Sequence, residues 1–110
     1  MAFKYEYQLT KRAESDLNSI VSYIAVELAN IKAAANFLDE LQVVIDEIRM
    51  FPESGFLVEN EFIKIENIRK KLIGNYIMYY FFNQSEKLIY ILRIVYSRRN
   101  IDEIIKKMDI

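Results

Sequence analysis

The sequence predicts an α+β fold in which a helical hairpin covers one face of an antiparallel-rich sheet. Short stretches at the start and in the second half of the chain alternate apolar and polar residues, which is typical of half-buried strands. Between them, apolar residues recur at spacings of three and four, which is typical of amphipathic helices. With 53% hydrophobic residues, two glycines and one proline, the composition indicates dense regular structure in a single domain, residues 1–110.

The first half of the chain is predicted to form a strand followed by a helical hairpin. Residues 3–9 alternate apolar and polar side chains and predict the strand. Thr10 is a candidate N-cap for a helix over residues 11–29, and Asn30 separates this helix from a second one. The second helix is expected to end before Pro52, because proline has no amide and disfavours helical geometry in the preceding residue. The short link between the helices predicts that they lie antiparallel.

The second half is predicted to contain three strands and a last short helix. The segment "PESGFLVENE", residues 52–61, has the composition of a loop. Strands are expected in "IRKKLI" (68–73), "YIMYYFF" (76–82) and "LIYILRIVYS" (88–97), with turns between them. Asn100 is a candidate cap for the last helix, which has acidic residues in its first turn and lysines near its end. The predicted order is therefore β-α-α-β-β-β-α.

Composition excludes several kinds of chemistry. The chain has no cysteine and no histidine, so it lacks a thiolate nucleophile, the commonest general base and the commonest metal ligand. Any catalysis would depend on Lys, Arg, Tyr, Asp or Glu. The acidic residues do not have metal-ligand spacing, so neither a metal nor another cofactor is expected. The sequence has no signal segment and no uncharged run of about 18 residues, so we expect a cytoplasmic protein without a membrane partner.

The charges are distributed unevenly along the chain. Residues 1–62 contain five Lys or Arg and eleven Asp or Glu, whereas residues 63–110 contain ten and five. The net charges of these halves are −6 and +5. The basic half is where an anionic partner would dock, although mutual neutralisation at the surface accounts for the asymmetry equally well.

Arg93 is the most informative charge in the last predicted strand. Simple alternation places Arg93 on one face with Ile89, Ile91 and Val95, where it interrupts an apolar row. A buried and unpaired guanidinium is very costly. Arg93 is therefore expected either to meet a carboxylate or to open onto a solvated concave face, and we favour the salt bridge.

Arg98 and Arg99 follow this strand directly, with Tyr96 beside them. Strand ends are often charged because they leave the core. Guanidinium groups on a rigid strand end are also suited to forked contacts with phosphate or carboxylate. The pair therefore marks a candidate functional surface.

A second basic cluster, Arg69, Lys70 and Lys71, lies in the first strand of the second half. Lysine on an edge strand discourages aggregation between sheets, and contact with a target or nucleic acid is the competing interpretation. The acidic residues Glu14 and Asp16 are interpreted as part of a solvated helix face.

The ordered set of elements, with "YQLTKRAESDLNSIVSYI", a lone "FPESG", "IRKKLIGNYIMYYFF" and "ILRIVYSRRNIDEI", resembles the RelE/ParE superfamily of toxins from bacterial toxin-antitoxin pairs. The resemblance covers nearly the whole chain and is closer to the ParE branch. It implies the RelE/ParE-like fold, a plasmid-stabilisation module and a cognate antitoxin partner. ParE members poison DNA gyrase, whereas RelE-type members cut messenger RNA in the ribosome.

The resemblance separates these two activities at individual positions. RelE has an arginine after the tyrosine of the aromatic strand and a tyrosine in the C-terminal segment, where this chain has Ile77 and Ile104. The arginine just past the last strand of RelE is matched by Arg98, and the lysines of RelE fall near Lys70. A RelE-style nuclease is therefore less expected than a toxin that binds its target.

The resemblance thus implies a gyrase-binding toxin. Its candidate target-binding residues are five basic residues of the second half, namely Arg69, Lys71, Arg93, Arg98 and Arg99. The alternative is a metal-independent, ribosome-dependent mRNA endonuclease that would use Arg98, Tyr96 and Lys70 for catalysis. A diverged, non-toxic member of the fold is the third hypothesis. A homodimer and a toxin-antitoxin hetero-oligomer are both compatible with each of these.

Overall fold

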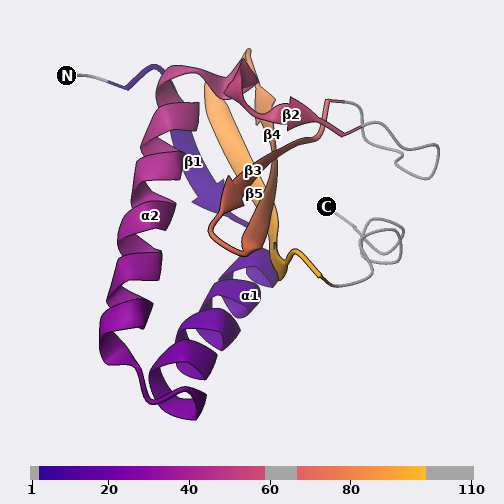
Figure 1. Ribbon diagram of the computed structural model, residues 1–110. Coiled ribbons are helices and arrows are strands. Elements are labelled where there is room, and N and C mark those ends of the chain that lie inside the picture. The colour runs from indigo at the N-terminus through magenta and orange to yellow at the C-terminus, as the bar shows by residue number, and fades with distance from the viewer. Residues whose placement is uncertain (1–2, 59–66, 99–110) are drawn as a thin grey trace.

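A five-stranded sheet in the order β1-β5-β4-β3-β2 carries the two long helices on one of its faces (Figure 1). The computed structural model describes residues 3–58 and 67–98 of the chain. β1 (Glu6–Leu9) pairs with β5 (Leu88–Tyr96) in parallel, and the other neighbouring strands are antiparallel. The predicted α+β class with an antiparallel-rich sheet is confirmed.

The helical hairpin consists of α1 (Lys11–Ser22), a π-helical turn η1 (Tyr23–Glu27) and α2 (Ile31–Met50). The predicted N-cap at Thr10 is confirmed, because its side-chain oxygen accepts a hydrogen bond from the amide of Ala13 at 3.1 Å. Asn30, expected only to separate the helices, caps α2 in the same way and accepts from the amide of Ala33 at 3.0 Å. The two helices run in opposite directions and lie on the same side of the sheet (Figure 1).

The segment after α2 contains a strand that was predicted as loop. A 3-10 turn, η2 (Pro52–Ser54), leads into β2 (Phe56–Leu57), which pairs with β3 (Arg69–Ile73). The prediction of a loop over residues 52–61 is therefore wrong at residues 56–57, because two residues are too short a stretch to show a period of two. β4 (Tyr76–Asn83) completes the sheet, and the helix predicted from residue 100 onward lies outside the described residues.

A bulge in β5 changes which side chains share a face of the sheet. Arg93 pairs with Tyr79, and Ile91 pairs with the very next residue of β4, so Leu92 is an additional residue in β5. Beyond the bulge, Ile94 faces the helices with Ile91. Simple alternation placed Ile89, Ile91, Arg93 and Val95 on one face. This prediction is wrong, because a period of two does not continue through a bulge.

Two apolar clusters lie on opposite faces of the sheet. The larger cluster fills the space between the helices and the sheet; its most buried members include Ala13, Ile48, Met78, Tyr80, Ile89 and Ile91. The smaller cluster, on the face away from the helices, comprises Ile68, Ile77, Tyr79, Leu92 and Val95. Each buried aliphatic or aromatic side chain contributes about 1.5 to 3 kcal/mol, so the larger cluster holds the hairpin on the sheet.

No helix within the described ranges combines the length and the apolar character that crossing a membrane requires.

Candidate functional site

The last strand ends beside the turn between β3 and β4. The amide of Ser97 donates a hydrogen bond to the carbonyl oxygen of Asn75 at 2.8 Å, which extends the β4–β5 pairing by one residue. Arg98 follows immediately and is exposed. Within residues 3–58 and 67–98, no carboxylate forms an ion pair with Arg98. Arg99 lies outside the described residues.

Tyr96 belongs to a cluster of aromatic side chains on the helix side of the sheet. Its ring meets the ring of Tyr76 edge-on, with centroids 5.6 Å apart, and Tyr76 meets Phe37 of α2 in the same way at 5.2 Å. Burial raises the pKa of Tyr76, and the neighbouring phenols of Tyr23 and Tyr96 raise it further.

These tyrosines line an open groove of about 1000 Å³ between the helical hairpin and the ends of β4 and β5. The π-helical turn adds one residue per turn, so the amide of Leu28 reaches back five residues to the carbonyl of Tyr23 at 3.0 Å. Tyr23 and Leu28, which line the groove, remain 51% and 54% exposed. The groove thus presents apolar surface that no other described part of the chain covers, and the sequence analysis did not identify it. The apolar periodicity of residues 11–29 could not reveal it, because a π-turn rotates the later side chains out of that pattern.

Arg93 is buried and paired with Asp16 of α1. Its Nε donates to Asp16 Oδ2 at 2.7 Å and its Nη2 donates to Oδ1 at 3.2 Å. The expected salt bridge is therefore confirmed. The side chain of Asp16 is only 17% exposed, so its assignment to a solvated helix face is wrong.

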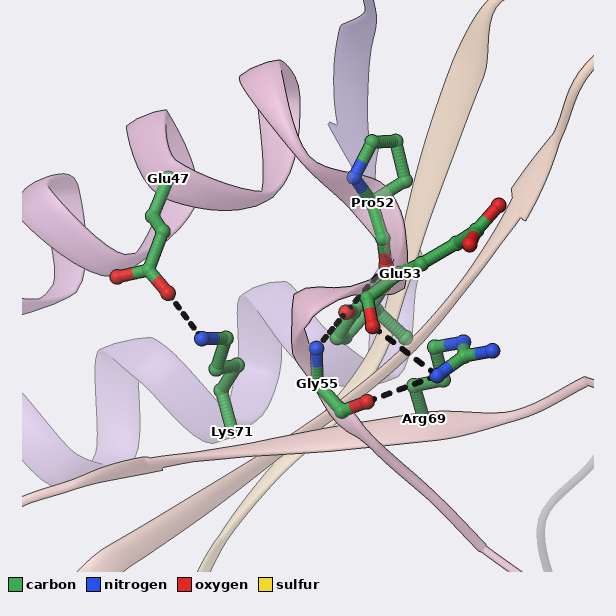
Figure 2. Close-up of polar contacts among 7 residues, drawn as sticks. Glu47, Pro52, Glu53, Gly55, Arg69 and Lys71 are labelled. Atoms are coloured by element: carbon green, nitrogen blue, oxygen red, sulfur yellow. Dashed lines mark hydrogen bonds and ion pairs between the residues drawn. The ribbon is translucent and has the colours of Figure 1, made fainter.

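Arg69 is bonded to the turn that follows α2. Its Nη1 donates to the carbonyl oxygens of Glu53 at 3.2 Å and Gly55 at 2.9 Å (Figure 2). The same turn is held from inside the sheet by Tyr80, whose hydroxyl donates to the carbonyl of Pro52 at 2.6 Å and accepts from the amide of Gly55 at 3.0 Å. Burial raises the pKa of Tyr80. Arg69 therefore has a structural task in addition to any contact with a target.

The two lysines of β3 lie on opposite faces of the sheet. Lys71 points toward α2, where its ammonium pairs with the carboxylate of Glu47 (Figure 2). Lys70 pairs in register with Tyr79, which belongs to the cluster on the face away from the helices. The ammonium of Lys70 forms no ion pair with another residue of the described ranges.

The structure does not bring the three candidate catalytic residues together. Tyr96 pairs with Tyr76 on the helix face, whereas Lys70 pairs with Tyr79 on the opposite face. The two pairs are also three residues apart along β4, about 10 Å at the rise of a strand. A single phosphate cannot contact both Lys70 and Tyr96. Only Tyr96 and Arg98 share one end of the sheet.

Within the described residues, no three acidic side chains form a group that could hold a metal ion.

Comparisons with known proteins identify a matching family and structures of the same fold. The family model described as "ParE toxin of type II toxin-antitoxin system, parDE" matches residues 7–101. No curated protein matches the sequence significantly.

Several solved structures share the fold. A chain of the chromosomal ParDE toxin-antitoxin system from P. aeruginosa has 18% sequence identity and a TM-score of 0.65, with 86% of this chain and 98% of that chain covered. A chain of the RelBE2 toxin-antitoxin complex from Mycobacterium tuberculosis has 16% identity and a TM-score of 0.60, with coverages of 84% and 98%. A chain of the archaeal RelE-RelB complex from Pyrococcus horikoshii OT3 has 19% identity and a TM-score of 0.58, with coverages of 87% and 98%.

Proposed function

We propose that this chain, which belongs to the family of ParE toxins of type II toxin-antitoxin systems, inhibits DNA gyrase by binding it and is neutralised by a cognate antitoxin. The observation that carries this proposal is the separation of Lys70 from Tyr96 onto opposite faces of the sheet. Phosphodiester cleavage needs proton transfer and charge stabilisation at one scissile phosphate. A binding function needs no such convergence.

Arg98, together with Arg99, is the proposed contact with the target. Arg98 is exposed at a strand end that is fastened by the contact between Ser97 and Asn75, so its guanidinium is available to an anionic group. The proposed target-binding set also includes Arg69, Lys71 and Arg93. Because these three side chains bond to other residues of the chain, their role is chiefly structural.

The antitoxin is proposed to cover the tyrosine-lined groove. An amphipathic helix can insert apolar side chains between Tyr23, Leu28 and Tyr96, and such a segment commonly folds as it binds. The product would be a toxin-antitoxin hetero-oligomer, in the cytoplasm where gyrase and ribosomes operate.

The test is a gyrase supercoiling reaction with the purified protein, run in parallel with a translation reaction. The expected result is accumulation of cleaved plasmid DNA and intact ribosome-bound mRNA. The Arg98→Ala variant is the matched control and should leave supercoiling normal. Cuts in translated mRNA with normal supercoiling would contradict the gyrase proposal.

The second candidate function is a ribosome-dependent endonuclease, which the proximity of Tyr96 and Arg98 favours. Their common location at the end of β5 would supply one proton-transferring group and one charge-stabilising group without Lys70. If neither gyrase nor mRNA is affected, the third hypothesis, a non-toxic member of the family, replaces both.

A further inference from the structure

The face of the sheet away from the helices is covered near the end of β5. Four apolar side chains of β4 and β5 on this face are only 1 to 4% exposed, namely Ile77, Tyr79, Leu92 and Val95. α1 and α2 both lie on the other face (Figure 1), and no described helix or strand lies over these four side chains. A sheet face with nothing packed on it is open to water, so another segment of the chain must cover this one.

This cover is restricted to one end of the face. Phe81 and Tyr90, whose rings stack 4.9 Å apart on the same face further from the end of β5, are only partly buried. Leu72 of β3 is the register partner of Ile77, yet it is 59% exposed. The covering segment therefore lies over the end of β5 and the start of β4 and does not extend to β3.

The sequence after β5 has the pattern and the length of such a cover. Four apolar residues share the spacing of a single helix stripe, namely Ile101, Ile104, Ile105 and Met108. A helix over residues 101–108 would be about 12 Å long, and the strand from Leu92 to Val95 spans about 10 Å. The segment also starts close to the covered face, because Arg98 is only three residues beyond Val95.

The two faces at the end of β5 differ sharply in exposure. Val95 and Tyr96 are neighbours in the strand and point to opposite faces. Tyr96 is 39% exposed beside the open groove lined by Tyr23 and Leu28, whereas Val95 is 2% exposed. The contrast favours the face away from the helices as the location of the following segment. The burial is present in a single chain, so it does not require a second copy.

We propose that residues 101–108 dock as an amphipathic helix on the face of the sheet away from the hairpin, with their apolar stripe against Leu92 and Val95. Arg98 and Arg99 then lie in a short link that is held at both ends, by the pairing of Ser97 at the end of β5 and by the docked helix. A link held in this way presents its guanidinium groups to a target at a lower entropic cost. This consequence rests on the proposed function, whereas the docking itself does not.

The docking is tested with a nitroxide label on the full-length protein. The chain has no cysteine, so Lys107→Cys supplies a single attachment point beside the apolar stripe. Methyl resonances report where the label lies, because a nitroxide broadens the signals of nearby nuclei. We expect the label to broaden Leu92 and Val95 more strongly than Leu28, which lines the groove on the other face.

Two neighbouring substitutions separate docking from other effects of changing the segment. Ile105→Gln places an amide in the apolar stripe and should abolish the selective broadening. Lys106→Gln introduces the same side chain at the next position, outside the stripe, and should preserve it. In the gyrase supercoiling reaction, we expect Ile105→Gln to require about tenfold more protein for the same inhibition, and Lys106→Gln less than about twofold more.

Each outcome has a defined meaning. Equal broadening on both faces, or stronger broadening of Leu28, overturns the docking. Broadening that increases with protein concentration comes from a second copy and also overturns it. Selective broadening of Val95, with gyrase inhibition unchanged in Ile105→Gln, confirms the docking and overturns its role in presenting Arg98. Selective broadening in a wild-type protein that does not inhibit gyrase confirms the docking while the proposed function fails.

Discussion

The carboxylate of Asp16 in α1 accepts hydrogen bonds from both Nε and Nη2 of Arg93 in β5, at 2.7 and 3.2 Å. It also accepts a hydrogen bond from the amide of Ile94 at 3.0 Å. β1 ends at Leu9, so beyond that point the edge of β5 has no parallel neighbour, and α1 takes over its hydrogen bonds. Thr10 contributes by donating its hydroxyl to the carbonyl of Leu92 at 3.0 Å.

Replacing Asp16 should therefore destabilise the protein strongly. Asp16→Ala leaves the guanidinium of Arg93 buried without its partner, and the expected loss is about 3 kcal/mol in the free energy of unfolding. Urea denaturation measures this loss. Glu14→Ala, at an exposed position on the same helix, should change stability by less than about 0.5 kcal/mol. Equally small losses of unfolding free energy in Asp16→Ala and Glu14→Ala would show that the ion pair between Asp16 and Arg93 adds nothing to stability.

Gly55 should not tolerate a side chain. A Cβ at this position would lie 2.5 Å from the hydroxyl of Tyr80 and 2.9 Å from the carbonyl oxygen of Lys70. We expect Gly55→Ala to cost about 1 to 3 kcal/mol, because backbone and a buried ring must shift.

Gly74 supplies the comparison for that prediction. Its φ of 57° favours glycine, but a Cβ there would approach Glu40 no closer than 3.6 Å. Asparagine adopts this backbone region readily, so Gly74→Asn should cost less than Gly55→Ala in the same thermal denaturation series. The reverse order would contradict the packing argument.

Stability should fall at alkaline pH in a manner that depends on Tyr80. Burial raises the pKa of Tyr80 in the folded protein above its ordinary value of 10.0. Between pH 10.0 and the raised pKa of the folded state, the unfolded chain has lost the Tyr80 proton that the folded chain still binds. The free energy of unfolding therefore decreases as pH rises through this interval. Urea midpoints measured between about pH 8 and about pH 11 should show this decrease.

The Tyr80→Phe variant identifies the source of that pH dependence. It should be less stable at neutral pH by about 1 to 3 kcal/mol, because it leaves the amide of Gly55 and the carbonyl of Pro52 without their buried partner. It should also lose less stability above pH 10.0 than the wild type. The pKa of Tyr76 is also raised by burial, so Tyr76 accounts for the decrease of stability with pH that remains in this variant. An unchanged alkaline slope in Tyr80→Phe would exclude Tyr80 as its cause.

Arg98→Ala should relieve growth inhibition in cells that express the protein without its antitoxin. The side chain is exposed, so the variant should unfold within about 0.5 kcal/mol of the wild type. Lys32→Ala, at an exposed position of α2, serves as the control and should remain toxic. Full toxicity of Arg98→Ala would remove Arg98 from the proposed target-binding surface.

Tyr96→Phe distinguishes binding from catalysis. A nuclease that uses the phenol for proton transfer would lose most of its activity with the hydroxyl, whereas a binding toxin keeps the ring and its contact with Tyr76. We expect Tyr96→Phe to remain toxic in plating assays. Loss of toxicity in this variant, with retained folding, would favour the endonuclease.

Local sequence signals identified much of the fold. Thr10 was recognisable as a cap because its short side chain can accept from a free amide three residues on, and Asn30 was recognisable as the break between the helices. Pro52 marked the end of the second helix for an equally local reason. β2 escaped recognition because its two residues are held in strand geometry by pairing with Arg69 and Lys70, which are distant in sequence.

The candidate site was only partly accessible from the sequence. Arg98 could be singled out by its place after the last strand, and the salt bridge of Arg93 could be expected from the cost of burying a charge. Its partner could not be identified, because Asp16 lies 77 residues away in sequence. The groove lined by Tyr23 depends on a π-helical turn, which leaves no pattern that apolar periodicity detects.

The sequence by itself determined the α+β class, the start of the first helix, the end of the second and the basic character of the second half, because spacing, capping and composition act over a few residues. Only the tertiary structure decided which charges are available. It engages Lys71 with Glu47 and Arg93 with Asp16, leaves Arg98 exposed, and places Lys70 and Tyr96 on opposite faces. The physical reason is that strand register, the bulge at Leu92 and helix docking set the direction of each side chain, and these depend on contacts between residues far apart in the chain.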